Sequence, residues 1–212
     1  MLLVSGWTIA ARLQPGSFNA VTSSVSALAA QGAADRWVMT FAFLIAGACE
    51  VATGLALRPA TPAGRLVLMA GGAAGMLVAA SPEPAGGGSS GRHAVAAVAG
   101  LVALAVWPAA ARRRGHWVPW GLRPGVSASA SAVLLGHLLW FGAELVTGAG
   151  QAGLAERVMG ALQALWPLLV VLSCYRSQSP GQAPATCLLG VGTRGEAHRR
   201  TGSHRQPCRH PP

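Results

Sequence analysis

Long apolar runs fill most of the chain up to about residue 175, separated by short clusters of proline, glycine and arginine. Five of these runs approach or reach the roughly 20 residues that a membrane-spanning helix needs. They cover residues 37–57, 65–80, 93–111, 126–147 and 158–175. A bundle of soluble helices would carry polar faces at helical spacing, and these runs have almost none. The pattern predicts an all-α, polytopic membrane helix bundle.

A sixth apolar run, residues 1–13, has about two thirds of the length required to cross a membrane. A signal peptide is the less favoured interpretation, because no basic segment precedes the run and no small-residue cleavage site follows it. We therefore expect six transmembrane helices within residues 1–175. The first is short, either because the true start lies upstream or because this helix enters the membrane only part way.

The composition agrees with this class, since 52% of the residues are hydrophobic and only 10% are charged. The net charge is +10, and every basic side chain other than histidine is an arginine. These arginines flank the apolar runs and form no basic face with interleaved aromatics, so we do not expect nucleic-acid binding. The four cysteines do not form the pattern of a disulfide framework.

The arginines also predict an orientation, because short cytoplasmic loops accumulate them. Most lie at one end of the predicted helices, and four lie at the other end: Arg12, Arg36, Arg92 and Arg157. We expect a multi-pass protein of the cell membrane with both termini in the cytoplasm. Aromatic belts are then expected at Trp37 on the outer side and at Trp107, Trp117 and Trp120 on the inner side.

Residues 176–212 are rich in proline, glycine, serine, arginine and histidine, with no apolar periodicity. This composition predicts a disordered, basic cytoplasmic tail. His198, His204, Cys208 and His210 lack the close paired spacing of a zinc site. We therefore expect no metal and no cofactor.

Ionisable residues inside a membrane are costly, so Glu50, His137 and Glu144 are functional candidates. His137 and Glu144 are seven residues apart and share one helix face. A proton relay through Glu50 and His137 is one interpretation. Hydrogen bonding between helices is the favoured one.

A second group of candidates lies where helices meet the outer surface: Asp35, Arg36, His93, Glu144, Glu156 and Arg157. The favoured interpretation is structural, with acids capping helix starts and arginines anchoring at lipid headgroups. The functional interpretation is a polar outer pocket beneath the Ser- and Thr-rich residues 17–30. Such a pocket suits a lipid headgroup or a small anion.

Three classes of function follow. A membrane protein that binds lipids or a partner is favoured, and Gly71 and Gly75 permit close packing within the chain, against another membrane protein or against a second copy. A small proton-coupled transporter would use Glu50, His137 and Glu144. An enzyme acting on a lipid-linked substrate is less expected. It would use His93 as a base, oriented by Asp35 or Glu144, and Ser24 or Ser26 as a nucleophile, but no nucleophile motif surrounds either serine.

Several segments together resemble a known family, the actinobacterial polytopic membrane proteins catalogued as domain of unknown function 998. The segments are residues 14–16, 25–30, 35–39, His93, 155–157 and 163–167. The resemblance runs from about residue 14 to residue 172. It implies six membrane helices and no assigned activity. The chain departs from the family in its shorter first helix, its long tail, and residues 18–20, where the family tends to have an aromatic residue, a polar residue and proline.

Overall fold

The computed structural model describes residues 2–16, 18–85, 88 and 90–177, and the predicted tail lies outside these residues apart from its first two positions. The described chain forms six α-helices and two short 3₁₀ helices. These are α1 (Leu2–Leu13), η1 (Ser26–Ala29), α2 (Trp37–Ala56), α3 (Pro62–Ala80), α4 (Gly91–Ala111), η2 (Trp120–Leu122), α5 (Pro124–Thr147) and α6 (Ala152–Ser177). Five α-helices are long and apolar enough to cross a membrane, and α1 is shorter. The predicted membrane helix bundle with a short first helix is confirmed.

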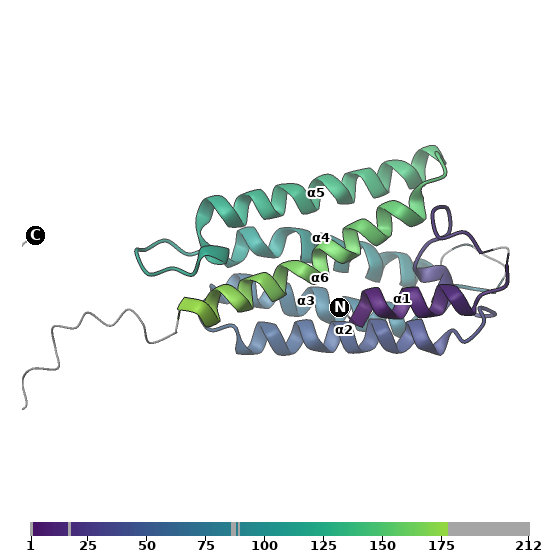
Figure 1. The fold of residues 1–212 in the computed structure, drawn as a ribbon, viewed down its shortest axis with the longest axis horizontal. Helices are drawn as coiled ribbons and strands as arrows, with labels where there is room; N and C mark the ends of the chain where they lie inside the picture. Colours follow the sequence, from purple (N-terminus) through teal and green to yellow (C-terminus); the bar gives the residue numbers. More distant parts are fainter. Residues whose placement is uncertain (1, 17, 86–87, 89, 178–212) are drawn as a thin grey trace, which may run out of the picture. The chain divides into compact units, whose positions relative to one another are not determined.

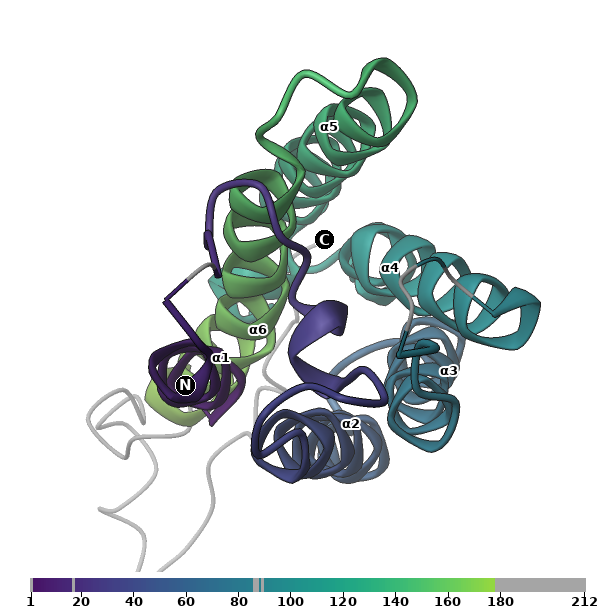
Figure 2. The ribbon, with the colours of Figure 1, turned by 90° about the vertical axis from the view of Figure 1, so that its right-hand side faces the viewer.

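The helices lie side by side along one direction (Figure 1). At one end, α1, α3 and α5 finish and α2, α4 and α6 begin. We call it the capped end, because residues 18–30 lie across it (Figure 2). The opposite end is the arginine end. With 12 residues α1 is about 18 Å long, whereas the 20 residues of α2 extend about 30 Å, so α1 accompanies only part of α2.

Four of the helices begin earlier than the apolar pattern predicted, at residues 62, 91, 124 and 152 instead of 65, 93, 126 and 158. Two of them, α3 and α4, begin at a residue whose side chain bonds to the first turn. The Thr61 hydroxyl accepts a hydrogen bond from the Gly64 amide at 3.2 Å, and the Ser90 hydroxyl accepts one from the His93 amide at 3.2 Å. Such a hydrogen bond to the first turn fixes where the helix begins. The helix therefore begins before the apolar run does.

Glycines allow α2, α3 and α4 to pack closely. A Cβ atom on Gly72 would lie 2.5 Å from the Gly47 carbonyl oxygen, so only glycine fits where α3 crosses α2. A Cβ atom on Gly71 would lie 2.7 Å from the Leu104 side chain of α4. The predicted packing role of Gly71 is confirmed, and Gly47 with Gly72 forms a second close approach.

Two apolar clusters fill the bundle at different depths. The floor cluster, toward the arginine end, contains Leu57, Ala60, Leu68, Trp107, Ala111, Leu122, Val170 and Cys174. The roof cluster, toward the capped end, contains Trp7, Ala10, Val25, Leu28, Ala29, Met39 and Ala42. The prediction that Trp107 belongs to an aromatic belt is wrong, because its side chain is 0% exposed within the floor cluster. Trp37 and Trp117 are 56% and 86% exposed, as a belt requires.

Candidate functional site

Residues 18–30, here called the cap, fold over the bundle between α2, α4 and α6 (Figure 2). Gln14 closes the base of this loop, because its side-chain amide donates to the Ala34 carbonyl at 2.8 Å and accepts from the Ala34 amide at 3.1 Å. The Leu154 amide of α6 donates to the Val21 carbonyl at 3.0 Å. The cap is therefore held by hydrogen bonds at its base and along α6.

Arg157 and Glu156 supply the strongest of these attachments. Arg157 Nη1 donates to the carbonyl oxygens of Ala20 at 2.6 Å and Ser23 at 2.9 Å. The Glu156 carboxylate accepts a hydrogen bond from the Val25 amide at 2.7 Å. Backbone groups that leave water need such partners, and charged partners bind them more strongly than neutral ones. The predicted outer residues Glu156 and Arg157 thus hold the cap in place.

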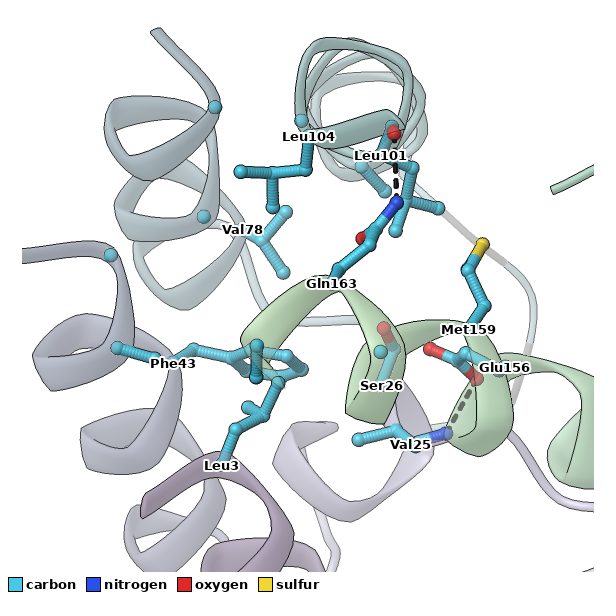
Figure 3. A pocket seen from close by; sticks show the side chains of 18 of the residues that line it. Leu3, Val25, Ser26, Phe43, Val78, Leu101, Leu104, Glu156, Met159 and Gln163 are labelled. Carbon is cyan, nitrogen blue, oxygen red and sulfur yellow. Dashed lines mark hydrogen bonds between the residues drawn. The ribbon is translucent and has the colours of Figure 1, made fainter. Parts of the chain in front are cut away.

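Beneath the cap lies a cavity of about 120 Å³ between the roof and floor clusters. Its walls come from the cap and from α1, α2, α3, α4 and α6. They are mainly apolar, and four of these helices contribute glycine to the lining. Four of the lining residues carry polar side chains: Ser26, Glu50, Glu156 and Gln163. In Figure 3 the Glu156 carboxylate lies beside Ser26, and Gln163 reaches from α6 toward α4.

The polar groups of this cavity are chiefly hydrogen-bond acceptors. Gln163 is 2% exposed, and its amide nitrogen donates to the Leu101 carbonyl at 2.9 Å, which leaves its amide oxygen as an acceptor. Glu50 makes no hydrogen bond or ion pair with any residue in the described part of the chain. It follows Trp37, the first residue of α2, by 13 positions, so it lies about 20 Å from the start of the helix. A carboxylate at that depth without a partner is costly.

A second polar contact joins the loop after α3 to the start of α4. His93 is 4% exposed; its Nδ1 donates to the Ser81 carbonyl at 2.8 Å, and its Nε2 lies 3.6 Å from Glu83 Oε1. Burial raises the pKa of the Glu83 carboxyl above its ordinary value, and His93 opposes that rise. The Gln31 amide donates to the Glu83 carbonyl at 2.8 Å, so this loop also adjoins the end of the cap.

The other predicted outer residues lie apart from the cap attachments. Glu144, near the end of α5, accepts hydrogen bonds from Trp140 Nε1 at 3.3 Å and from the Gln151 amide at 2.9 Å. Arg36 stacks on the Trp37 ring, with its Cζ atom 4.2 Å from the ring centre. Asp35 is exposed and has a left-handed φ of 47°.

The prediction that acidic side chains bond to the free amides at the start of a helix is wrong for both Asp35 and Glu156. The start of α2 has no side-chain cap hydrogen bond, so Asp35 does not cap that helix. Glu156 bonds to the cap segment and not to the free amides of its own helix.

Glu50 and Glu156 line the same cavity, to which α5 contributes no residue. His137 Nδ1 donates to the Val133 carbonyl at 2.8 Å, and neither His137 nor Glu144 lines the cavity. The serines proposed for an enzyme are also placed apart from their base. Ser24 accepts from the Ala27 amide at 3.0 Å, and Ser26 lines the cavity, from whose walls His93 is absent.

Sequence reasoning missed Glu83 and Gln163. Gln163 carried a usable signal, because an amide side chain within an apolar run commonly bonds to a neighbouring helix. Glu83 carried none, since an acid between two prolines in a connecting segment is typical of an ordinary exposed loop.

Comparison with known proteins gives one match. The family model described as "Protein of unknown function (DUF998)" matches residues 1–173 of the chain. No curated protein matches the chain, and no solved structure matches it. The match covers all six α-helices except the last four residues of α6, and with them the cap and the cavity.

Proposed function

We propose that this chain, which belongs to the DUF998 family of proteins of unknown function, binds a small amphipathic cation in the cavity beneath its cap. The apolar body of the ligand would lie among α2, α3, α4 and α6. Its amine head would donate to Glu50. The observation that carries the proposal is that two carboxylates, Glu50 and Glu156, line one mainly apolar cavity.

The chemistry of the lining favours a cation or a strong donor over an anion. A carboxylate removed from water is stabilised by a donor or a positive charge, and Glu50 has no such partner within the described chain. No arginine or histidine is among the residues that line the cavity, and Arg157, which adjoins Glu156 in sequence, bonds to the cap through its Nη1. An anionic ligand would therefore meet two acids and no lining cation.

The size of the cavity limits the ligand. A cavity of about 120 Å³ is somewhat smaller than an engineered protein cavity of ~150 Å³ that accepts benzene. This scale favours a short alkyl or aryl amine over a whole lipid.

The packing around the cavity favours a binding protein over a transporter that moves its substrate across the membrane. The floor cluster, centred on the fully buried Trp107, closes the bundle between the cavity and the arginine end. A proton-coupled transporter would have to open this cluster in each cycle. The depth of Glu50 in the bundle is the observation that still supports a transporter. The binding test below applies to both a binding protein and a transporter, because transport also begins with binding.

Binding is tested with three probes of equal chain length: n-butylamine, n-butanol and butyrate. Isothermal titration of the purified full chain in detergent at neutral pH should give saturable binding of butylamine, weaker binding of butanol and none of butyrate. Glu50→Gln should weaken butylamine binding about 10- to 100-fold, because it removes a charge-assisted hydrogen bond.

Glu144→Gln is the matched control, since Glu144 lies on α5 outside the cavity lining. It should leave butylamine binding unchanged. Equal binding of butyrate and butylamine, or full retention of butylamine affinity in Glu50→Gln, would refute the proposal.

We also propose that the arginine end faces the cytoplasm of a cell, following the positive-inside rule. The test uses a variant with its four cysteines replaced by alanine, into which Trp117→Cys or Thr22→Cys is introduced. Both positions are exposed, at opposite ends of the bundle. In intact cells an impermeant maleimide should label only the Thr22→Cys protein. Labelling of only the Trp117→Cys protein would show that the arginine end faces away from the cytoplasm and would contradict the proposal.

A further inference from the structure

A second apolar hollow lies between α5 and α6, apart from the cavity beneath the cap. It measures about 610 Å³ and is lined by Gly125, Val126, Ser129, Ala130, Val133, Leu134, Leu162, Leu165, Trp166 and Leu169. We call it the α5–α6 groove. The two helices meet at their short connection and diverge toward the arginine end (Figure 1). The groove shares no lining residue with the cavity that holds Glu50.

Charge is distributed unevenly between the two ends of the bundle. Over the described residues, the arginine end carries seven arginines and no acidic residue: Arg58, Arg65, Arg112, Arg113, Arg114, Arg123 and Arg176. The capped end carries four arginines and four acids: Arg12, Arg36, Arg92, Arg157, Asp35, Glu83, Glu144 and Glu156. An anionic headgroup is therefore attracted to the end toward which the groove widens.

Arg123 adjoins the lining of the groove in sequence. It directly precedes Pro124, the first residue of α5, and it is two residues before the lining residue Gly125. Its Nε donates a long hydrogen bond of 3.4 Å to the Val118 carbonyl, while its two Nη groups bond to nothing in the described chain. Its side chain is exposed, so a phosphate can approach the guanidinium.

Two exposed tryptophans indicate that the segment before α5, which includes Arg123, lies at the depth of lipid headgroups. Trp117 is 86% exposed and Trp120 is 40% exposed, both just before Arg123 in the chain. Exposed tryptophans concentrate at the boundary between hydrocarbon and headgroups. The apolar groove therefore extends from the headgroup level into the hydrocarbon region.

We propose that the α5–α6 groove binds one acyl chain of an acidic phospholipid whose phosphate is held by Arg123. The walls of the groove match a hydrocarbon chain, and the arginine end matches the charge of the headgroup. This site is independent of the cation proposed for the cavity, because neither its residues nor its ligand chemistry are shared.

The test measures lipid binding to the purified full chain by native mass spectrometry. Dioleoyl phosphatidylglycerol should give a saturable single-lipid adduct, and dioleoyl phosphatidylcholine should bind more weakly. Arg123→Gln should weaken phosphatidylglycerol binding about fivefold, the effect of removing one cation near an anionic headgroup. Ala130→Trp should abolish the adduct by filling the groove.

Two matched controls accompany these variants. Arg58→Gln removes an exposed arginine from the same end but from the α2–α3 connection, and Val98→Trp adds a tryptophan to an exposed position of α4. Both should retain the adduct. The proposal is overturned if Arg58→Gln weakens binding as much as Arg123→Gln, if both lipids bind equally, or if Ala130→Trp retains the adduct. It is also overturned if Ala130→Trp converts a lipid-free dimer to a monomer, because a second copy would then occupy the groove.

Discussion

Replacing Arg157 with methionine is expected to release the cap and to lower the free energy of unfolding by about 2–4 kcal/mol. Methionine retains much of the side-chain length but has no donor. The carbonyl oxygens of Ala20 and Ser23, and that of Gly153 at 2.9 Å, would each lose a charged partner. Hydrogen exchange of the amides in residues 18–30 should accelerate, and the thermal midpoint in detergent should fall.

Arg36→Met provides the control, because Arg36 lies at the same end and stacks on Trp37 without bonding to the cap. Exchange in residues 18–30 should be unchanged in this variant. If Arg157→Met left the exchange of the cap amides at the wild-type rate, the guanidinium would not be what holds the cap.

Glu156→Gln separates the attachment of the cap from the charge of the cavity. The glutamine oxygen can still accept from the Val25 amide, so the cap should remain in place. The cavity nevertheless loses one of its two carboxylates. Effects of this variant on amine binding therefore report on charge and not on a displaced cap.

Trp107→Ala is expected to lower the free energy of unfolding by about 3–5 kcal/mol, the largest effect of any single substitution considered. Trp107 is 0% exposed and packs with Leu68, Leu122 and Val170 in the floor cluster. Removing the indole leaves a void that the neighbouring helices fill only in part. The change is measured by unfolding in mixed micelles.

Trp117→Ala removes the same group from a position that is 86% exposed and should change stability by less than about 0.5 kcal/mol. Equal losses in the two variants would show that the floor cluster does not stabilise the bundle. Trp107→Ala and Trp117→Ala also test whether the floor cluster closes the cavity toward the arginine end. If Trp107 separates the cavity from the arginine end, only Trp107→Ala should admit a larger amine such as n-octylamine.

If the cavity binds the proposed amine, that binding should be coupled to the cap. Glu156 lines the cavity and accepts from the cap amide of Val25, and Ser26 of the cap lines the cavity as well. Movement of residues 18–30 therefore changes the cavity wall directly. Exchange rates in the cap with and without butylamine would measure this coupling.

The sequence by itself determined the class, the number of helices and most of their boundaries. Apolar runs such as 37–57 are long enough to cross a membrane, and backbone groups in lipid must bond within a helix. That requirement is local, so it can be read along the chain. The helices α3 and α4 begin three and two residues before their apolar runs, because the side chains of Thr61 and Ser90 bond to the first turn.

The tertiary structure alone decided which residues form the site. A membrane helix is apolar on nearly every face, so its pattern does not tell which side turns inward. For this reason Trp107 was predicted at a belt and lies in the core, while Glu50 faces a cavity that His137 does not reach. The bond between Val25 and Glu156 joins residues 131 positions apart. Such a contact depends on how the helices rotate and pack, which is fixed by close approaches such as Gly47 with Gly72 and not by any local pattern.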